Sequence, residues 1–66
     1  MTIQLNGEPC DLPAPLTIAD LLGRLEIDPR RVAVERNFAV VKRDRYGSTQ
    51  VEAGDQIEIV NFVGGG

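Results

Sequence analysis

The stretch TIADLLGRL, residues 17–25, decides the fold, because it carries the clearest secondary-structure signals in the chain. Thr17 followed by Asp20 predicts a capping box at a helix N-terminus, and Leu16 and Leu21 occupy the two positions of a hydrophobic staple. Apolar residues at helical spacing form one stripe: Ile18, Leu21, Leu22 and Leu25. We expect the helix to end at Asp28-Pro29, since a residue before proline disfavours the α conformation.

Short strands are predicted on both sides of this helix. Residues 2–6 alternate like a half-buried strand, Asn6-Gly7 predicts a tight hairpin turn, and residues 9–12 return as an edge strand because Pro9 cannot donate a ladder hydrogen bond. After the helix, residues 32–36 and 39–42 predict a second hairpin around Asn37. Residues 43–50 are polar and irregular, with Tyr46 as an expected anchor on the core.

The last strand is predicted over residues 56–62, after a turn in which Gly54 supplies a positive φ. One helix with one apolar stripe covers one face of a mixed sheet, and the right-handed crossover rule favours the first and last strands side by side at its centre. We therefore predict an α+β, ubiquitin-like β-grasp fold with four to five strands. Residues 1–63 form a single domain in this prediction, and residues 64–66 a flexible glycine tail.

Composition excludes several classes of function. The net charge of −3 argues against nucleic acid as the main partner, and the absence of His removes the usual general base and metal ligand. Cys10 is the only cysteine, so we expect a small packed hydrophobe and no metal site. No phosphate-binding glycine motif, secretory leader or membrane-length apolar run is present. We expect a cytoplasmic monomer without bound cofactor.

Basic residues form two small groups, one at residues 30–31 and one at residues 42–45. A solvated surface of mixed charge explains them most simply. The alternative interpretation is a docking surface for an acidic patch on a protein partner.

The C-terminal residues are the candidate functional site. Val60 and Phe62 lie on the strand face opposite Ile57 and Ile59, so they are either an uncovered docking surface or are covered by Phe38, Tyr46 or the irregular segment. Val63 and Gly64 would then act as a spacer between the strand and the last two residues. Those residues, Gly65 and Gly66, end in a free carboxylate. With few catalytic side chains elsewhere, the Gly66 carboxylate is the best candidate reactive group.

These features resemble the ThiS sulfur carriers of thiamine biosynthesis. The resemblance rests on the capped helix at residues 17–22, the segment at residues 51–59 and the terminal pair Gly65-Gly66. It implies that a ThiF-type, ubiquitin-activating-like adenylyltransferase activates Gly66 with ATP. Sulfur from a cysteine desulfurase route would then give a thiocarboxylate, which a ThiG-type thiazole synthase consumes. The chain would thus be a protein cosubstrate and not an enzyme.

Three alternatives share parts of this pattern. The small subunit of molybdopterin synthase has the same fold and terminus, and a ubiquitin-like modifier shares the adenylation step. A plain interaction module with an inert tail is the third alternative.

Overall fold

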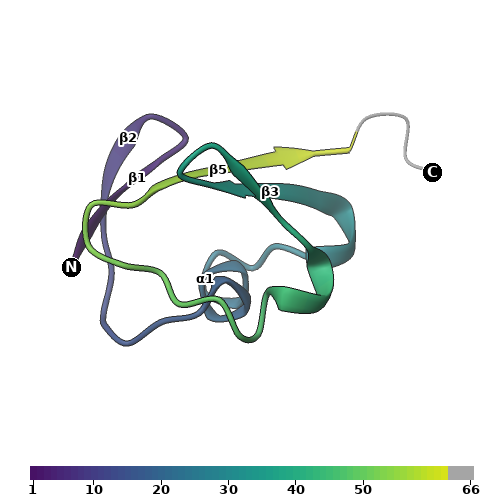
Figure 1. Ribbon diagram of the computed structural model, residues 1–66, viewed down its shortest axis with the longest axis horizontal. Helices are drawn as coiled ribbons and strands as arrows, with labels where there is room; N and C mark the ends of the chain where they lie inside the picture. Colours follow the sequence, from purple (N-terminus) through teal and green to yellow (C-terminus); the bar gives the residue numbers. More distant parts are fainter. Residues whose placement is uncertain (63–66) are drawn as a thin grey trace.

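The structure is a computed structural model that describes residues 1–62. Its elements are, in chain order, β1 (Thr2–Leu5), β2 (Glu8–Asp11), α1 (Ile18–Arg24), η1 (Pro29–Arg31), β3 (Val32–Arg36), β4 (Ala39–Val41), η2 (Arg43–Arg45) and β5 (Gln56–Asn61), where η marks a 3₁₀ turn. The strands form one five-stranded sheet in the order β2-β1-β5-β3-β4, and α1 lies against one face of it (Figure 1).

The predicted centre of the sheet is confirmed. β5 is the middle strand and pairs in parallel with β1 and antiparallel with β3, while the two hairpins β1–β2 and β3–β4 are antiparallel. β2 lies at the sheet edge, as Pro9 requires. Asn6 and Gly7 both have positive φ, 49° and 82°, which is the geometry predicted for the first hairpin turn.

The core lies between α1 and the sheet. It contains Ile3, Leu12, Leu16, Ile18, Leu21, Leu22, Val32, Val34, Tyr46, Val51 and Ile57. Cys10 is half-buried against this core, as expected for a small hydrophobe. Tyr46 is the predicted anchor of the irregular segment, and its hydroxyl donates to the Val32 carbonyl at 3.5 Å.

The start of α1 follows the prediction closely. Thr17 Oγ1 accepts a hydrogen bond from the Asp20 amide at 3.1 Å, and Asp20 Oδ2 accepts one from the Thr17 amide at 3.0 Å. These reciprocal bonds are the capping box that the sequence predicts.

The end of α1 was predicted too late. The helix stops at Arg24, before the expected end at Asp28-Pro29, because Glu26 adopts φ 58°. The Glu26 and Ile27 amides then donate to the carbonyls of Gly23 and Leu22, at 3.1 Å and 2.9 Å. This pattern is a Schellman motif with glutamate where glycine is usual, so no sequence signal marked it. Leu25, which was assigned to the apolar stripe, is consequently exposed.

Candidate functional site

β5 ends at the candidate site. The chain remains paired with its neighbour up to residue 62, because the Phe62 amide donates to the Arg31 carbonyl at 2.9 Å. Val60 and Phe62 are 60% and 55% exposed. Tyr46, one of the residues considered as a cover, is buried in the core. Among the described residues, Val60 and Phe62 are therefore uncovered, and their role in partner binding stays a prediction.

The other predicted site residues lie beyond this point. Val63, Gly64, Gly65 and Gly66 are outside the described residues, so the predicted reactive carboxylate has no structural description here. What the structure fixes is the position of Phe62, from which these four residues continue.

The sheet face opposite α1 carries more exposed apolar surface than the sequence indicated. Val60 is the partner of Ala33 on β3, and Val40 on β4 is the partner of Glu35. Because alternate residues Val32 and Val34 are buried, Val40 and Val60 lie on the outer face, where Val40 is 72% exposed. We call the exposed apolar residues Phe38, Val40, Val60 and Phe62 the open face.

Phe38 is the most unusual member of the open face. It is 79% exposed and has φ 70°, next to Asn37 with φ 52°, in the two-residue turn that joins β3 to β4. A bulky residue in the left-handed region costs about 1–2 kcal/mol, and glycine normally occupies this turn position. The sequence predicted a turn around Asn37 and gave no positive φ to Phe38. Only two residues separate Arg36 from Ala39, and a hairpin loop of two residues favours a positive φ at both of them.

Two carboxylates face each other on the same side of the sheet. Glu35 and Glu58 are direct cross-strand partners, and both are exposed. Their Cβ atoms are therefore expected about 4.5–5.5 Å apart, a distance at which like charges destabilise a sheet. Neither carboxylate forms an ion pair with another residue of the range 1–62. The outer face thus combines apolar side chains with unneutralised negative charge.

Asp55 holds the hairpin that carries Phe38. Its carboxylate accepts hydrogen bonds from Arg36 Nε at 2.6 Å, Asn37 Nδ2 at 3.0 Å and the Glu52 amide at 2.8 Å. Asn37 Oδ1 accepts from the Gln56 amide at 2.9 Å, and the Asn37 amide donates to the Gln56 carbonyl at 2.7 Å. The turn is thereby fixed to the beginning of β5.

The ionisation of Asp55 follows from these contacts. Burial by itself raises the pKa of the carboxyl, but the hydrogen bonds from Arg36, Glu52 and Asn37 outweigh burial and place the pKa below its ordinary value of 3.8. Asp55 is the one buried charged side chain within residues 1–62. Its structural role explains its charge, so it is not a candidate catalytic acid.

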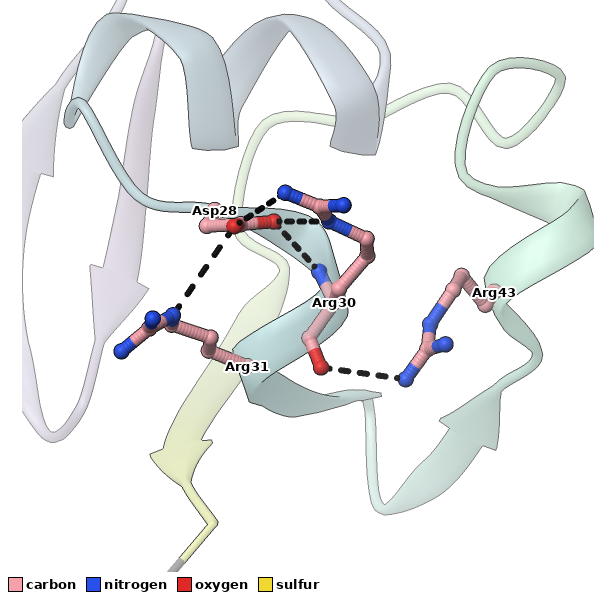
Figure 2. Close-up of polar contacts among 4 residues, drawn as sticks. All are labelled: Asp28, Arg30, Arg31 and Arg43. Carbon is pink, nitrogen blue, oxygen red and sulfur yellow. Dashed lines mark hydrogen bonds and ion pairs between the residues drawn. The ribbon is translucent and has the colours of Figure 1, made fainter. Parts of the chain in front are cut away.

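The fold also joins the two basic groups seen in the sequence. Figure 2 shows that Arg43, from η2, donates through Nη2 to the carbonyl of Arg30 in η1, at 3.3 Å. Asp28 binds Arg30 through Nε at 3.1 Å and Nη2 at 3.0 Å. The hydrogen bonds from Arg30 lower the pKa of Asp28 to about 2. The spacing along the chain gave no signal for this juxtaposition.

The described residues offer little for catalysis by side chains. Residues 1–62 hold no group of three side chains suited to a metal ion. They also hold no helix long and apolar enough to cross a membrane.

A mixed five-stranded sheet crossed by one helix, with its central strand leading to the C-terminal residues, defines a β-grasp protein of the ubiquitin-like class. A crystal structure of the thiamine biosynthesis protein ThiS from Geobacter metallireducens has the same fold, with a TM-score of 0.87, 33% identity and full coverage of both chains. The family model described as "ThiS family" matches residues 3–66. The chain belongs to the ThiS family, which confirms the resemblance found in the sequence.

Two relatives add to this assignment. The sulfur carrier protein ThiS of Bacillus subtilis is 40% identical over 65 residues, which are 97% of this chain and 98% of that protein. A thiazole synthase of Magnetococcus marinus is 52% identical over all 66 residues. This chain spans only about a fifth of the length of the thiazole synthases it matches. In those proteins, the similar segment is thus part of a much longer chain.

Proposed function

We propose that this chain is a sulfur carrier of thiamine biosynthesis and serves as a protein cosubstrate. The observation that carries the proposal is the family match, which runs from residue 3 through Gly66 and so includes the terminal glycine pair. The likeness to the Bacillus subtilis sulfur carrier over nearly its whole length supports the same role.

The chemistry centres on the Gly66 carboxylate. A C-terminal carboxyl group has a pKa of about 3.3–3.7, so at neutral pH it is ionised and a poor electrophile. A ThiF-type enzyme would use ATP to form the acyl adenylate, releasing pyrophosphate. Sulfur from a cysteine desulfurase route, delivered at the oxidation level of hydrosulfide after a thiol has reduced the carrier persulfide, would then attack the acyl carbonyl and displace AMP, which leaves a thiocarboxylate. Glycine suits this position because it has no side chain to hinder attack on its carbonyl and no stereocentre to racemise.

A ThiG-type thiazole synthase is the proposed acceptor of this sulfur. The support is the pair of thiazole synthases that contain a segment similar to the whole of this chain. Two proteins that act in succession gain from being joined, because the linker replaces a bimolecular encounter with a high effective concentration. The open face, whose residues Val60 and Phe62 lie at the end of β5, is the surface that we propose the receiving enzymes contact.

An intact mass measurement tests the proposal. The protein is incubated with ATP, its host's activating enzyme and a sulfur donor, and we expect one oxygen at Gly66 to be replaced by sulfur. Adducts to other proteins would instead indicate a ubiquitin-like modifier. An unchanged mass with several activating enzymes would contradict both functions. Sulfur transfer within molybdopterin synthase, with this chain as its small subunit, and no transfer to thiazole synthase would identify the molybdenum cofactor pathway.

One added residue gives a sharper control. A variant with a single alanine after Gly66 keeps every residue of the folded body, so its thermal unfolding should match that of the 66-residue protein. We expect no thiocarboxylate, because the carboxylate is moved away from the glycine pair. Activation of the extended protein without trimming would show that Gly66 is not the reacting residue.

A further inference from the structure

Charge is distributed unevenly along this chain. The segments 28–31 and 42–45 contain five of the seven Lys and Arg residues but only two of the ten Asp and Glu residues. The rest of the chain holds two basic and eight acidic residues. A protein with net charge −3 therefore has one strongly basic region. Such a separation of charge orients a molecule as it approaches a charged partner.

Tertiary structure gathers both segments at one place. η1 and η2 meet through the hydrogen bond from Arg43 to the Arg30 carbonyl (Figure 2). The Arg30 and Arg31 side chains are 79% and 83% exposed, and Arg31 lies 3.9 Å from Asp28 in a long ion pair. We call Arg30, Arg31, Lys42, Arg43 and Arg45 the basic cluster.

The basic cluster borders the candidate site. The Arg31 carbonyl accepts the hydrogen bond from the Phe62 amide at 2.9 Å, so η1, with Arg30 and Arg31 of the cluster, is fixed beside the last described residue of the chain. Only residues 63–66 separate this point from the C-terminal carboxylate. An enzyme that takes up these four residues must come close to the cluster, since four extended residues span at most about 14 Å.

We propose that the basic cluster docks onto an acidic protein surface beside the active site of the enzyme that adenylates Gly66, an inference that rests on the proposed function. Long-range attraction accelerates encounters between separate molecules. In the relatives that are thiazole synthases, the similar segment belongs to the same chain as the synthase, so that contact needs no diffusional encounter. In those relatives, a separate activating enzyme is the partner whose encounter depends on diffusion, and we assign the basic cluster of this chain to the same class of partner.

Nucleic acid fits these observations less well. Asp28 and Asp44 lie within the basic segments, and the remaining acidic residues would repel phosphates. The segments 28–31 and 42–45 contain no aromatic side chain on which a base could stack. An acidic protein surface requires only that opposite charges meet over a limited area.

A matched pair of charge reversals tests the proposal. Arg31→Glu changes the cluster, while Arg24→Glu makes the same change in net charge at an exposed residue at the end of α1, outside the cluster. Carrier-dependent ATP–pyrophosphate exchange by the host's activating enzyme gives kcat/KM for each variant. We expect Arg31→Glu to lower kcat/KM about tenfold at about 50 mM NaCl, with little change in kcat. Arg24→Glu should lower kcat/KM no more than about twofold.

Salt dependence and a second substitution complete the test. The deficit of Arg31→Glu should shrink at about 500 mM NaCl, where the Debye length is only a few ångströms. Arg31→Gln removes the charge without reversing it, so its loss of kcat/KM should be smaller and should also shrink with salt. It keeps the test valid if Arg31→Glu does not fold. Thermal unfolding of all variants is measured in parallel.

Three results would overturn the proposal. The first is an equal loss of kcat/KM in Arg31→Glu and Arg24→Glu. The second is a loss of kcat/KM in Arg31→Glu that salt does not reduce. The third is micromolar binding of a labelled single-stranded RNA or DNA that disappears in Arg31→Glu. A wild-type protein that the activating enzyme does not adenylate would overturn the proposed function and this inference together. That failure is seen before any variant is made, so the two cases are distinguishable.

Discussion

At the scale of single residues, four non-glycine residues have a positive φ, and two of them are not the asparagine that tolerates this region. Glu26 has φ 58° and ends α1, and Phe38 has φ 70° at the tip of the β3–β4 hairpin. Glu26 serves the fold, because its turn lets Ile27 return to the core. Phe38 is 79% exposed, so little burial offsets its backbone strain. We therefore propose that Phe38 contacts a partner.

Replacing Phe38 by glycine should separate stability from function. We expect Phe38→Gly to raise the free energy of unfolding by about 0.5–1 kcal/mol, because strain is relieved and little apolar surface is lost. Urea denaturation measures this change. The same variant should lower kcat/KM for activation or for sulfur transfer, since it removes the most exposed apolar side chain of the open face.

Phe38→Asn provides the control for this prediction. Asparagine tolerates the left-handed region, so it should also stabilise the turn while removing the aromatic ring. A loss of stability greater than about 1 kcal/mol in both variants would show that Phe38 packs against the fold and is not held for a partner.

At the scale of elements, a polar network holds the β3–β4 hairpin to β5. Asp55 comes directly before β5. Its carboxylate binds Arg36, the last residue of β3, and Asn37 in the turn that follows. A buried carboxylate of this kind is costly unless all its contacts are made. The network therefore sets the position of the turn, and of Phe38 within it, relative to the beginning of β5.

Asp55→Asn should weaken this junction. The asparagine side chain would keep the acceptor oxygen but lose the negative charge. Its NH2 group would face the donors Arg36 and Asn37, which it cannot accept from. We therefore expect the free energy of unfolding at neutral pH to fall by about 2 kcal/mol. Glu52→Gln is the control, because the Glu52 side chain is exposed and only its backbone amide binds Asp55. An Asp55→Asn protein as stable as wild type would contradict the assigned role.

The pH dependence follows from the sign of the pKa shift. The pKa of Asp55 is lower in the folded protein than its ordinary value of 3.8, so the unfolded chain binds a proton more readily. The stabilisation that ionised Asp55 gives the fold is complete at pH values above 3.8 and is lost as the pH falls through the lower pKa of the folded protein. Asp55→Asn should therefore lose less stability than wild type between neutral pH and about pH 3.

At the scale of the whole molecule, the two faces of the sheet differ in what covers them. One face is covered by α1 and contains the core, and the other carries the open face and the Glu35–Glu58 pair. Arg31 of the basic cluster lies beside the end of β5, and η2 is joined to η1 by the hydrogen bond from Arg43 to the Arg30 carbonyl. A receiving enzyme that contacts the end of β5 would thus meet Val60, Phe62 and Arg31 together.

Replacing Val40 and Val60 by serine together should leave the fold intact. Both side chains are more than half exposed, so we expect a loss of no more than about 1 kcal/mol in the free energy of unfolding. Affinity for the activating enzyme or thiazole synthase, measured by calorimetry, should fall about tenfold or more. Leu25→Ser changes an exposed apolar residue next to α1 and should have little effect on that affinity. Unchanged affinity in the double variant would remove the open face from the proposed interface.

The sequence by itself determined the fold class and the reactive group that we propose. Capping residues, hydrophobic periodicity and turn residues act between near neighbours in the chain, so the start of α1, the Asn6-Gly7 turn and the alternation of β5 could be predicted from local patterns. The terminal glycine pair is also a local signal, and it carried the resemblance to the ThiS family.

Only tertiary structure decided which residues lie around the end of β5. The exposure of Val60 and Phe62 depends on what other segments cover, and the meeting of Arg30 with Arg43 depends on how η1 and η2 pack. The positive φ of Glu26 and Phe38 is imposed by the chain on either side of them, against their own preferences. Contacts between distant segments are set by the balance of packing over the whole core, which no local pattern encodes.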